Sequence, residues 1–93
     1  MKKLLSIMLL VVLFTTLLFS APIVFGSVTA EEIERVEEVP GIYVITIKYT
    51  KSSDASLLEK DKYNVATSQA ALDEFFNNVL PIEAERIKVK YGL

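Results

Sequence analysis

The sequence contains no cysteine and no histidine, and only three glycines and three prolines among its 93 residues. Without cysteine there can be no disulfide, and without either residue there is no thiolate or imidazole ligand for a metal ion. Nucleophilic Ser–His and Cys–His pairs are excluded as well, and histidine is the most common general acid or base at neutral pH. No glycine-rich phosphate loop is present. We therefore expect a protein that is not an enzyme and that has no cofactor.

The acidic and hydroxyl side chains that remain do not form a recognisable site. Asp54, Glu59 and Asp61 supply the oxygen ligands that Ca²⁺ prefers, but they do not follow the Asp-x-Asp-x-Asp-Gly loop pattern. Ser56 and Lys60 make a formal Ser–Lys pair without any signature spacing. We expect an ordinary solvated loop here, and we predict no catalytic and no metal-binding residue.

The first thirty residues have the layout of a secretory signal peptide. Lys2 and Lys3 precede an uncharged run, 4–19, and the segment ends in small residues. A basic start, an apolar middle and a small-residue finish are the features that such signals share. Val28 and Ala30 place small side chains at the two positions that a signal peptidase must accept. We therefore expect residues 1–30 to be a signal peptide that is cleaved after Ala30.

The alternative is an uncleaved membrane anchor. Residues 4–25 reach the roughly 20 positions that are needed to span a bilayer, and Lys2 and Lys3 would remain on the inner side. In both cases residues 31–93 are exported as one small domain. We expect a secreted, periplasmic or envelope protein or, in the alternative, a membrane-anchored protein with an exported C-terminal domain.

Charge and length limit what the exported part can do. Residues 31–93 carry 8 basic and 12 acidic side chains, a formal charge of −4. Nucleic-acid binding requires a basic surface that displaces counterions, so no nucleic-acid partner is expected. A chain of about sixty residues buries only about 60% of its unfolded surface. The domain must therefore have a well-packed core or be stabilised by a partner.

The segment 41–50 predicts a central strand. It is β-branched or aromatic almost throughout. One of its faces is apolar or aromatic over its whole length, whereas the other begins with Ile42 and Val44 and then turns polar. Such a pattern indicates a strand that is covered on one side and only partly covered on the other. Ile42 and Val44 are therefore candidates for contact with a partner.

The C-terminal segment 85–91 alternates between apolar and basic residues and predicts a half-buried strand. Arg86, Lys88 and Lys90 would share its solvated face. These three residues form a basic region that is either a solvated surface or a contact for a charged partner.

A helix is expected between the two strands. Thr67 or Ser68 can cap it, Pro81 should end it, and an apolar stripe follows the helical period: Leu72, Phe75, Phe76, Val79 and Leu80. A weaker strand, 62–66, precedes it. The predicted fold class is α+β, a small sheet of about three strands with one amphipathic helix packed on it, after the signal peptide.

The segment 31–39 is harder to assign. Ile33, Val36 and Val39 recur every third residue, and glutamate favours helix, so a short helix fits better than a strand. A strand that pairs with the next one across Pro40-Gly41 is the alternative. Five glutamates make this segment the acidic end of the domain.

Two functions are compatible with these features. The first is a small exported module without catalytic activity that binds or inhibits a protein partner, with a homo-oligomer also open. The second is a single-pass accessory protein of a membrane complex, which contacts the membrane through residues 4–25. Docking of an exposed strand or helix face would be the mechanism in either case.

Overall fold

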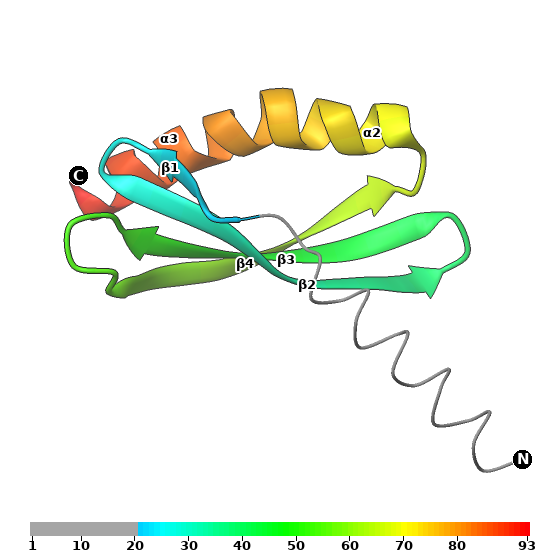
Figure 1. The fold of residues 1–93 in the computed structure, drawn as a ribbon, viewed down its shortest axis with the longest axis horizontal. Coiled ribbons are helices and arrows are strands. Elements are labelled where there is room, and N and C mark those ends of the chain that lie inside the picture. Colours follow the sequence, from blue (N-terminus) through cyan, green and yellow to red (C-terminus); the bar gives the residue numbers. More distant parts are fainter. Residues whose placement is uncertain (1–20) are drawn as a thin grey trace, which may run out of the picture.

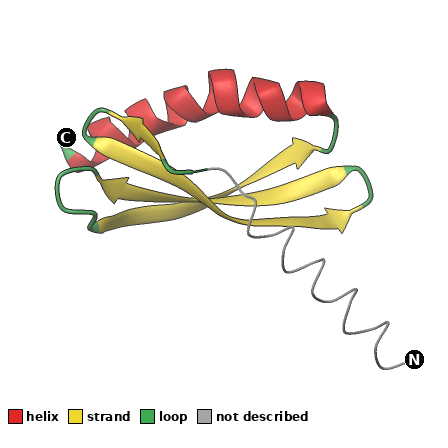
Figure 2. Ribbon diagram, viewed as in Figure 1, coloured by secondary structure: helices red, strands yellow, loops and turns green. Residues whose placement is uncertain are grey.

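The computed structural model describes residues 21–93, which form a four-stranded sheet with one long helix on one of its faces (Figures 1 and 2). The strands are β1 (Ile23–Phe25), β2 (Val28–Val39), β3 (Ile42–Lys51) and β4 (Leu57–Ala66), and the helical segments are α2 (Gln69–Glu74), η1 (Phe75–Val79) and α3 (Leu80–Tyr91). The sheet is antiparallel, and the spatial order of its strands is the sequence order, β1-β2-β3-β4. The predicted α+β class and the single helix on a sheet are confirmed, but the sheet has four strands rather than about three.

Glycine permits both tight turns at the ends of β2. Gly26 and Gly41 have φ angles of 63° and 85°, which side chains with a Cβ rarely adopt. Pro40 precedes Gly41 and restricts the chain to a turn conformation. The N–H of Gly41 also donates a hydrogen bond of 2.9 Å to the Glu37 carboxylate. These turns make β1, β2 and β3 consecutive antiparallel neighbours.

The short helix expected at 31–39 is wrong, and the alternative strand is correct. Residues 28–39 form one long strand that pairs with β3 across Pro40-Gly41. The register between β2 and β3 shifts twice, between Glu32 and Glu34 and between Val36 and Val39. Each shift inserts one extra residue on β2, as a β-bulge does.

The helix does not end at Pro81. Ser68 caps its start by accepting a hydrogen bond from the Ala71 N–H at 3.3 Å. A π-helical turn, η1, precedes the proline, and the Leu80 N–H bonds to the Phe75 carbonyl five residues earlier. Proline cannot make the ordinary i−4 bond. The wider π turn continues the helix into α3, with Pro81 in its first turn.

The strand predicted for residues 85–91 is also wrong, because this segment belongs to α3. Leu80, Ala84 and Ile87 are its buried residues, at spacings of four and three. Val89, which a strand would place beside Ile87, is 76% exposed. The helix ends at Gly92, whose φ of 68° allows a left-handed cap.

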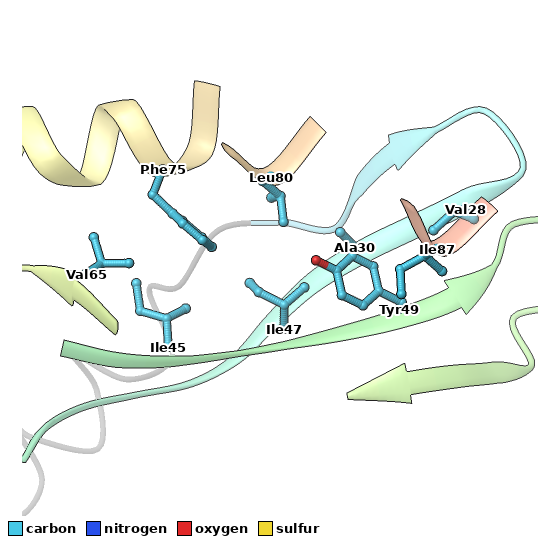
Figure 3. Close-up of a cluster of buried hydrophobic side chains, with 9 residues drawn as sticks. All are labelled: Val28, Ala30, Ile45, Ile47, Tyr49, Val65, Phe75, Leu80 and Ile87. Atoms are coloured by element: carbon cyan, nitrogen blue, oxygen red, sulfur yellow. The ribbon is translucent and has the colours of Figure 1, made fainter. Parts of the chain in front are cut away.

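The core lies between the helix and the covered face of the sheet (Figure 3). Side chains of β3 point toward the helix, and Phe75, Leu80 and Ile87 point back toward them. The buried cluster is Val28, Ala30, Ile45, Ile47, Tyr49, Val65, Phe75, Leu80 and Ile87. Tyr43, Tyr63 and Phe76 are partly buried against it. The predicted strand 62–66 is confirmed as the end of β4, which begins five residues earlier.

The sheet includes residues that lie before the expected domain boundary. Val28 is fully buried in β2, Ala30 is 2% exposed, and Ile23 and Phe25 of β1 pack against the core. A boundary after Ala30 therefore falls inside β2. Most of the predicted signal peptide, residues 1–20, lies outside the described residues. Within residues 21–93, no helix is both long enough and apolar enough to cross a membrane.

Candidate functional site: the open face of the sheet

The helix covers one face of the sheet, and the described chain leaves the other face uncovered (Figure 1). We call this second surface the open face. Its residues follow from the register, because directly paired residues point to the same side. Ile45, Ile47 and Tyr49 face the helix, so the residues between them on β3 face away. The open face comprises Val24, Thr29, Glu31, Glu34, Val36, Val39, Ile42, Val44, Thr46, Lys48, Thr50, Leu57, Lys60, Lys62, Asn64 and Ala66.

One end of the open face is apolar. Val36 lies opposite Val44, and Val39 lies opposite Ile42, beside the turn that joins β2 to β3. Val39 is 60% exposed, and Val36 and Ile42 are 39% and 37% exposed. Fully burying an exposed side chain of this kind is worth about 1.5–3 kcal/mol, and covering the part that is still exposed here contributes a fraction of that. This apolar end therefore offers binding free energy to a surface that covers it.

The middle of the open face separates its charges by strand. Glu31 and Glu34 lie on β2, whereas Lys60 and Lys62 lie on β4. Lys48 lies between them on β3, and its Nζ is 3.6 Å from a carboxylate oxygen of Glu31. The open face therefore has an acidic column of side chains along β2 and a basic column along β4. The apolar end lies beyond the same end of both columns.

The sequence-predicted partner residues fall into two groups. Ile42 and Val44 lie on the open face, as expected for the less covered side of this strand. Arg86, Lys88 and Lys90 lie on α3, on the opposite side of the sheet, and do not share a strand face.

The three basic residues of α3 are already paired within the domain. Arg86 Nη2 is 2.9 Å from Asp61 and 3.4 Å from Glu83. Lys90 Nζ is 2.7 Å from Glu59 on β4, and Lys88 pairs with Glu85 at 3.5 Å. A partner contact through these residues remains a prediction, but the structure gives their charges an internal role: Arg86 and Lys90 link α3 to β4, whereas Lys88 pairs within α3.

A chain of hydrogen bonds lies beside these ion pairs. The hydroxyl groups of Tyr49 and Tyr63 are 2.7 Å apart, and Tyr63 donates to Glu83 at 3.0 Å. Burial raises the pKa of Tyr49 to about 12 and raises that of Tyr63 as well. A hydrogen bond shared with Asp61, whose own pKa is raised, and one donated by Lys90 lower the pKa of Glu59 to about 2. At neutral pH this arrangement supplies two neutral phenols and paired charges, which suit a structural link between helix and sheet.

The buried tyrosines predict an alkaline loss of stability. A folded-state pKa of about 12, against 10.0 for an ordinary tyrosine, means that Tyr49 favours the folded state below pH 10. This contribution disappears as the pH rises from 10 to 12, and two pKa units amount to about 3 kcal/mol. Urea unfolding across this range should show a steep fall in the free energy of unfolding. The Tyr49→Phe variant should show a smaller fall, and an equal one would contradict the assignment.

Two hollows mark the described surface. One of about 310 Å³ lies between β4 and the first half of the helix, where Val65, Ala71 and Phe75 are among its lining residues. Another of about 570 Å³ lies along the outer side of α3, beside Ile82 and Val89. Both are open to solvent, so neither encloses a small molecule. Residues 21–93 also contain no cluster of acidic side chains that could hold a metal ion.

Val28 and Ala30, the predicted recognition positions for signal cleavage, lie in the sheet. Cleavage after Ala30 would remove all of β1, the buried Val28 and the pairs that residues 28–30 of β2 make with β3.

Comparison of the chain with protein-family models, with curated proteins and with solved structures found no match in any of the three.

Proposed function

We propose that the chain is an exported, non-catalytic module that binds a protein through the open face of its sheet. The observation that carries this proposal is the apolar end formed by Val36, Val39, Ile42 and Val44. These residues are well placed to contribute to binding because they lie outside the core that holds the helix to the sheet. The targeting layout of the N-terminal sequence supports export.

The arrangement of the open face specifies what kind of surface fits it. A partner needs an apolar strip to cover Val39 and Ile42. Beside that strip it needs basic groups opposite Glu31 and Glu34, and acidic groups opposite the lysines of β4. A sheet is the natural candidate, since sheets pack face to face at about 10 Å.

Substitution at the apolar end tests this function. Cells that produce the full chain are treated with an amine-reactive cross-linker, and the cross-linked products are separated by size. Ile42→Asp and Val44→Asp should abolish products heavier than the chain, because an aspartate at the contact would lose its hydration without a partner. Far-UV circular dichroism should remain native, since neither residue lies in the core under the helix.

The control for this experiment is Val89→Asp, which changes an exposed residue on α3. It should leave the cross-linked products unchanged. Persistence of these products in Ile42→Asp and Val44→Asp would overturn the proposal. So would unfolding of both variants, because their side chains would then belong to the core.

A second function, a membrane-anchored accessory protein, is favoured by where the sheet begins. Ile23 and Phe25 pack against the core, so a spanning segment would have to end before Ile23. The uncharged sequence 4–22 still has close to the roughly 20 residues that a membrane span requires. In this case the open face would bind its partner close to the membrane surface.

Intact mass separates the two functions. Membrane and soluble or secreted fractions of the producing cells are measured separately. A full-length species in the membrane would establish the anchor, and a shortened species in the soluble or secreted fraction would establish a free module. Neither fraction should contain a species that begins at Glu31, because such a chain lacks part of the core.

A further inference from the structure

The open face has the features that its own partner would need. It carries an apolar end, an acidic column on β2 and a basic column on β4. We infer that the protein which docks on this face is a second copy of the chain. This inference rests on the proposed function, since it names the partner of the same surface.

A twofold axis that runs along β3, between the two faces, makes the surface complementary to itself. The rotation places β2 of one copy over β4 of the other and keeps each end of the face over the same end. Glu31 then lies over Lys60 of the other copy, and Glu34 lies over Lys62. Because the symmetry is twofold, each of these contacts occurs twice.

The same axis superposes the two apolar ends. Ile42 and Val44 lie on the central strand, so each meets its own counterpart near the axis. On the outer strands, Val39 of one copy covers Ala66 of the other, and Val36 covers Asn64. An axis that runs across the strands would instead place the basic β4 over β4, and would set each apolar end against the opposite end. The charges therefore select the axis along β3.

Lys48 and Thr46 also lie near this axis. Two copies of Lys48 would face each other there, but each is within 3.6 Å of a Glu31 carboxylate oxygen in its own chain, which offsets its charge. Thr46 is uncharged and only 7% exposed, so it adds no charge to the middle of the face. The centre of the face therefore does not oppose the pairing.

The size of the face indicates a weak dimer. Ten-residue strands at about 3.4 Å per residue and about 4.8 Å between strands give a contact roughly 30 Å long and 15 Å wide. This is smaller than the roughly 800 Å² per partner of a standard interface. The association should therefore depend on concentration, and a cross-linking assay suits it better than gel filtration.

Because the chain contains no cysteine, a single introduced thiol can report on the dimer. In the full-length chain, Val44→Cys places one thiol near the proposed axis. The sheets would be about 10 Å apart, which is too far for a direct disulfide, so a short bis-maleimide is added. The expected product is a dimer of the chain. The matched control, Val89→Cys, places the thiol on the other side of the molecule and should give no dimer.

Charge reversal then tests the orientation. In the Val44→Cys background, one variant carries Lys60→Glu and Lys62→Glu, and a second carries Glu31→Lys and Glu34→Lys. Each variant alone places like charges opposite each other. The yield of cross-linked dimer should fall by about tenfold or more, the effect of a change of about 1.4 kcal/mol in binding free energy.

Mixing the two variants, one of them with a size tag, should restore the product. The acidic β2 and β4 columns of one variant then meet the basic columns of the other, and only the mixed dimer should appear. This recovery also shows that neither variant has lost its fold. Unchanged cross-linking in the separate variants, or no mixed dimer on co-production, would overturn the second copy as partner.

Failure of this inference can be distinguished from failure of the proposed function. If Ile42→Asp still abolishes a cross-linked product with a different protein, while charge reversal does not affect self-association, the face binds another protein and only the second copy is wrong. If Ile42→Asp changes no cross-linked product at all, both the proposed function and this inference are wrong.

Discussion

Removing residues 21–30 should unfold the domain. A chain of residues 21–93 is expected to unfold cooperatively in urea, whereas a chain of residues 31–93 should show no cooperative transition. The deleted segment contains Val28, which is fully buried, and Ile23 and Phe25, which pack against the core. Their burial, at about 1.5–3 kcal/mol for each fully buried side chain, contributes about 5 kcal/mol together with the lost strand pairs. A small domain has only about 5–10 kcal/mol in total.

The control for this truncation keeps the chain length and changes one surface residue. Val24→Ser lies in the same deleted segment, but its side chain is 66% exposed on the open face. It should change the free energy of unfolding by about 0.5 kcal/mol or less. A native circular dichroism spectrum and a cooperative transition for residues 31–93 would show that β1 and the start of β2 are dispensable. The expected cleavage after Ala30 would then be compatible with a folded product.

Ile87→Asp should unfold the protein, whereas Val89→Asp should have almost no effect. The Ile87 side chain is fully buried between α3 and the sheet, so an aspartate there would leave an unpaired charge in the core. The expected loss exceeds about 4 kcal/mol, which is most of the stability of a domain of this size. Val89 is 76% exposed, and a change there should remain within about 0.5 kcal/mol.

This pair distinguishes a helix from a strand at the C-terminus. In a strand, positions 87 and 89 would point to the same side, so both aspartates would be destabilising. Urea unfolding of the two variants against the wild-type chain provides the measurement. Equal destabilisation by both substitutions would contradict the helix α3.

The central strand could be predicted from sequence because one residue pattern determines it. Apart from Lys48 and Lys51, residues 42–51 are β-branched or aromatic, and their alternate positions separate a covered face from a less covered one. The candidate site was therefore partly predictable: Ile42 and Val44 were identified from this strand alone. The two columns of charge could not be identified, because they depend on which residues of β2 and β4 pair with β3.

The long strand β2 was not predictable from its period. Val36 and Val39 are three residues apart, as in a helix, yet both lie on the open face of a strand. This is possible because Val36 and Val39 are three residues apart on β2, whereas their partners on β3, Val44 and Ile42, are only two residues apart. A bulge thus produces a helical spacing within a strand. Nothing in the local sequence indicates where such an extra residue is placed.

The helix α3 was not predictable from its period, because its sequence has the pattern of a strand. Its charged residues alternate with apolar ones, as they do in a half-buried strand. The signal that could have shown it is the spacing of Leu80, Ala84 and Ile87, which places all three on one side of a helix. Pro81 concealed this continuity, because a proline ordinarily ends a helix unless a π turn precedes it.

The most direct test of the central claim is whether the open face is covered in cells that produce the chain. The Val36→Cys variant places a thiol on this face, and Val89→Cys places one on the outer side of α3; both native side chains are exposed in the isolated domain. Each full-length variant is labelled with a membrane-impermeant maleimide in intact cells or spheroplasts, and again after denaturation. The proposed docking predicts that the thiol at position 36 reacts at least about tenfold more slowly than that at position 89 before denaturation, and equally fast afterwards. Equal reaction rates in the native state would show that the open face is not occupied, and would contradict its role as a docking surface.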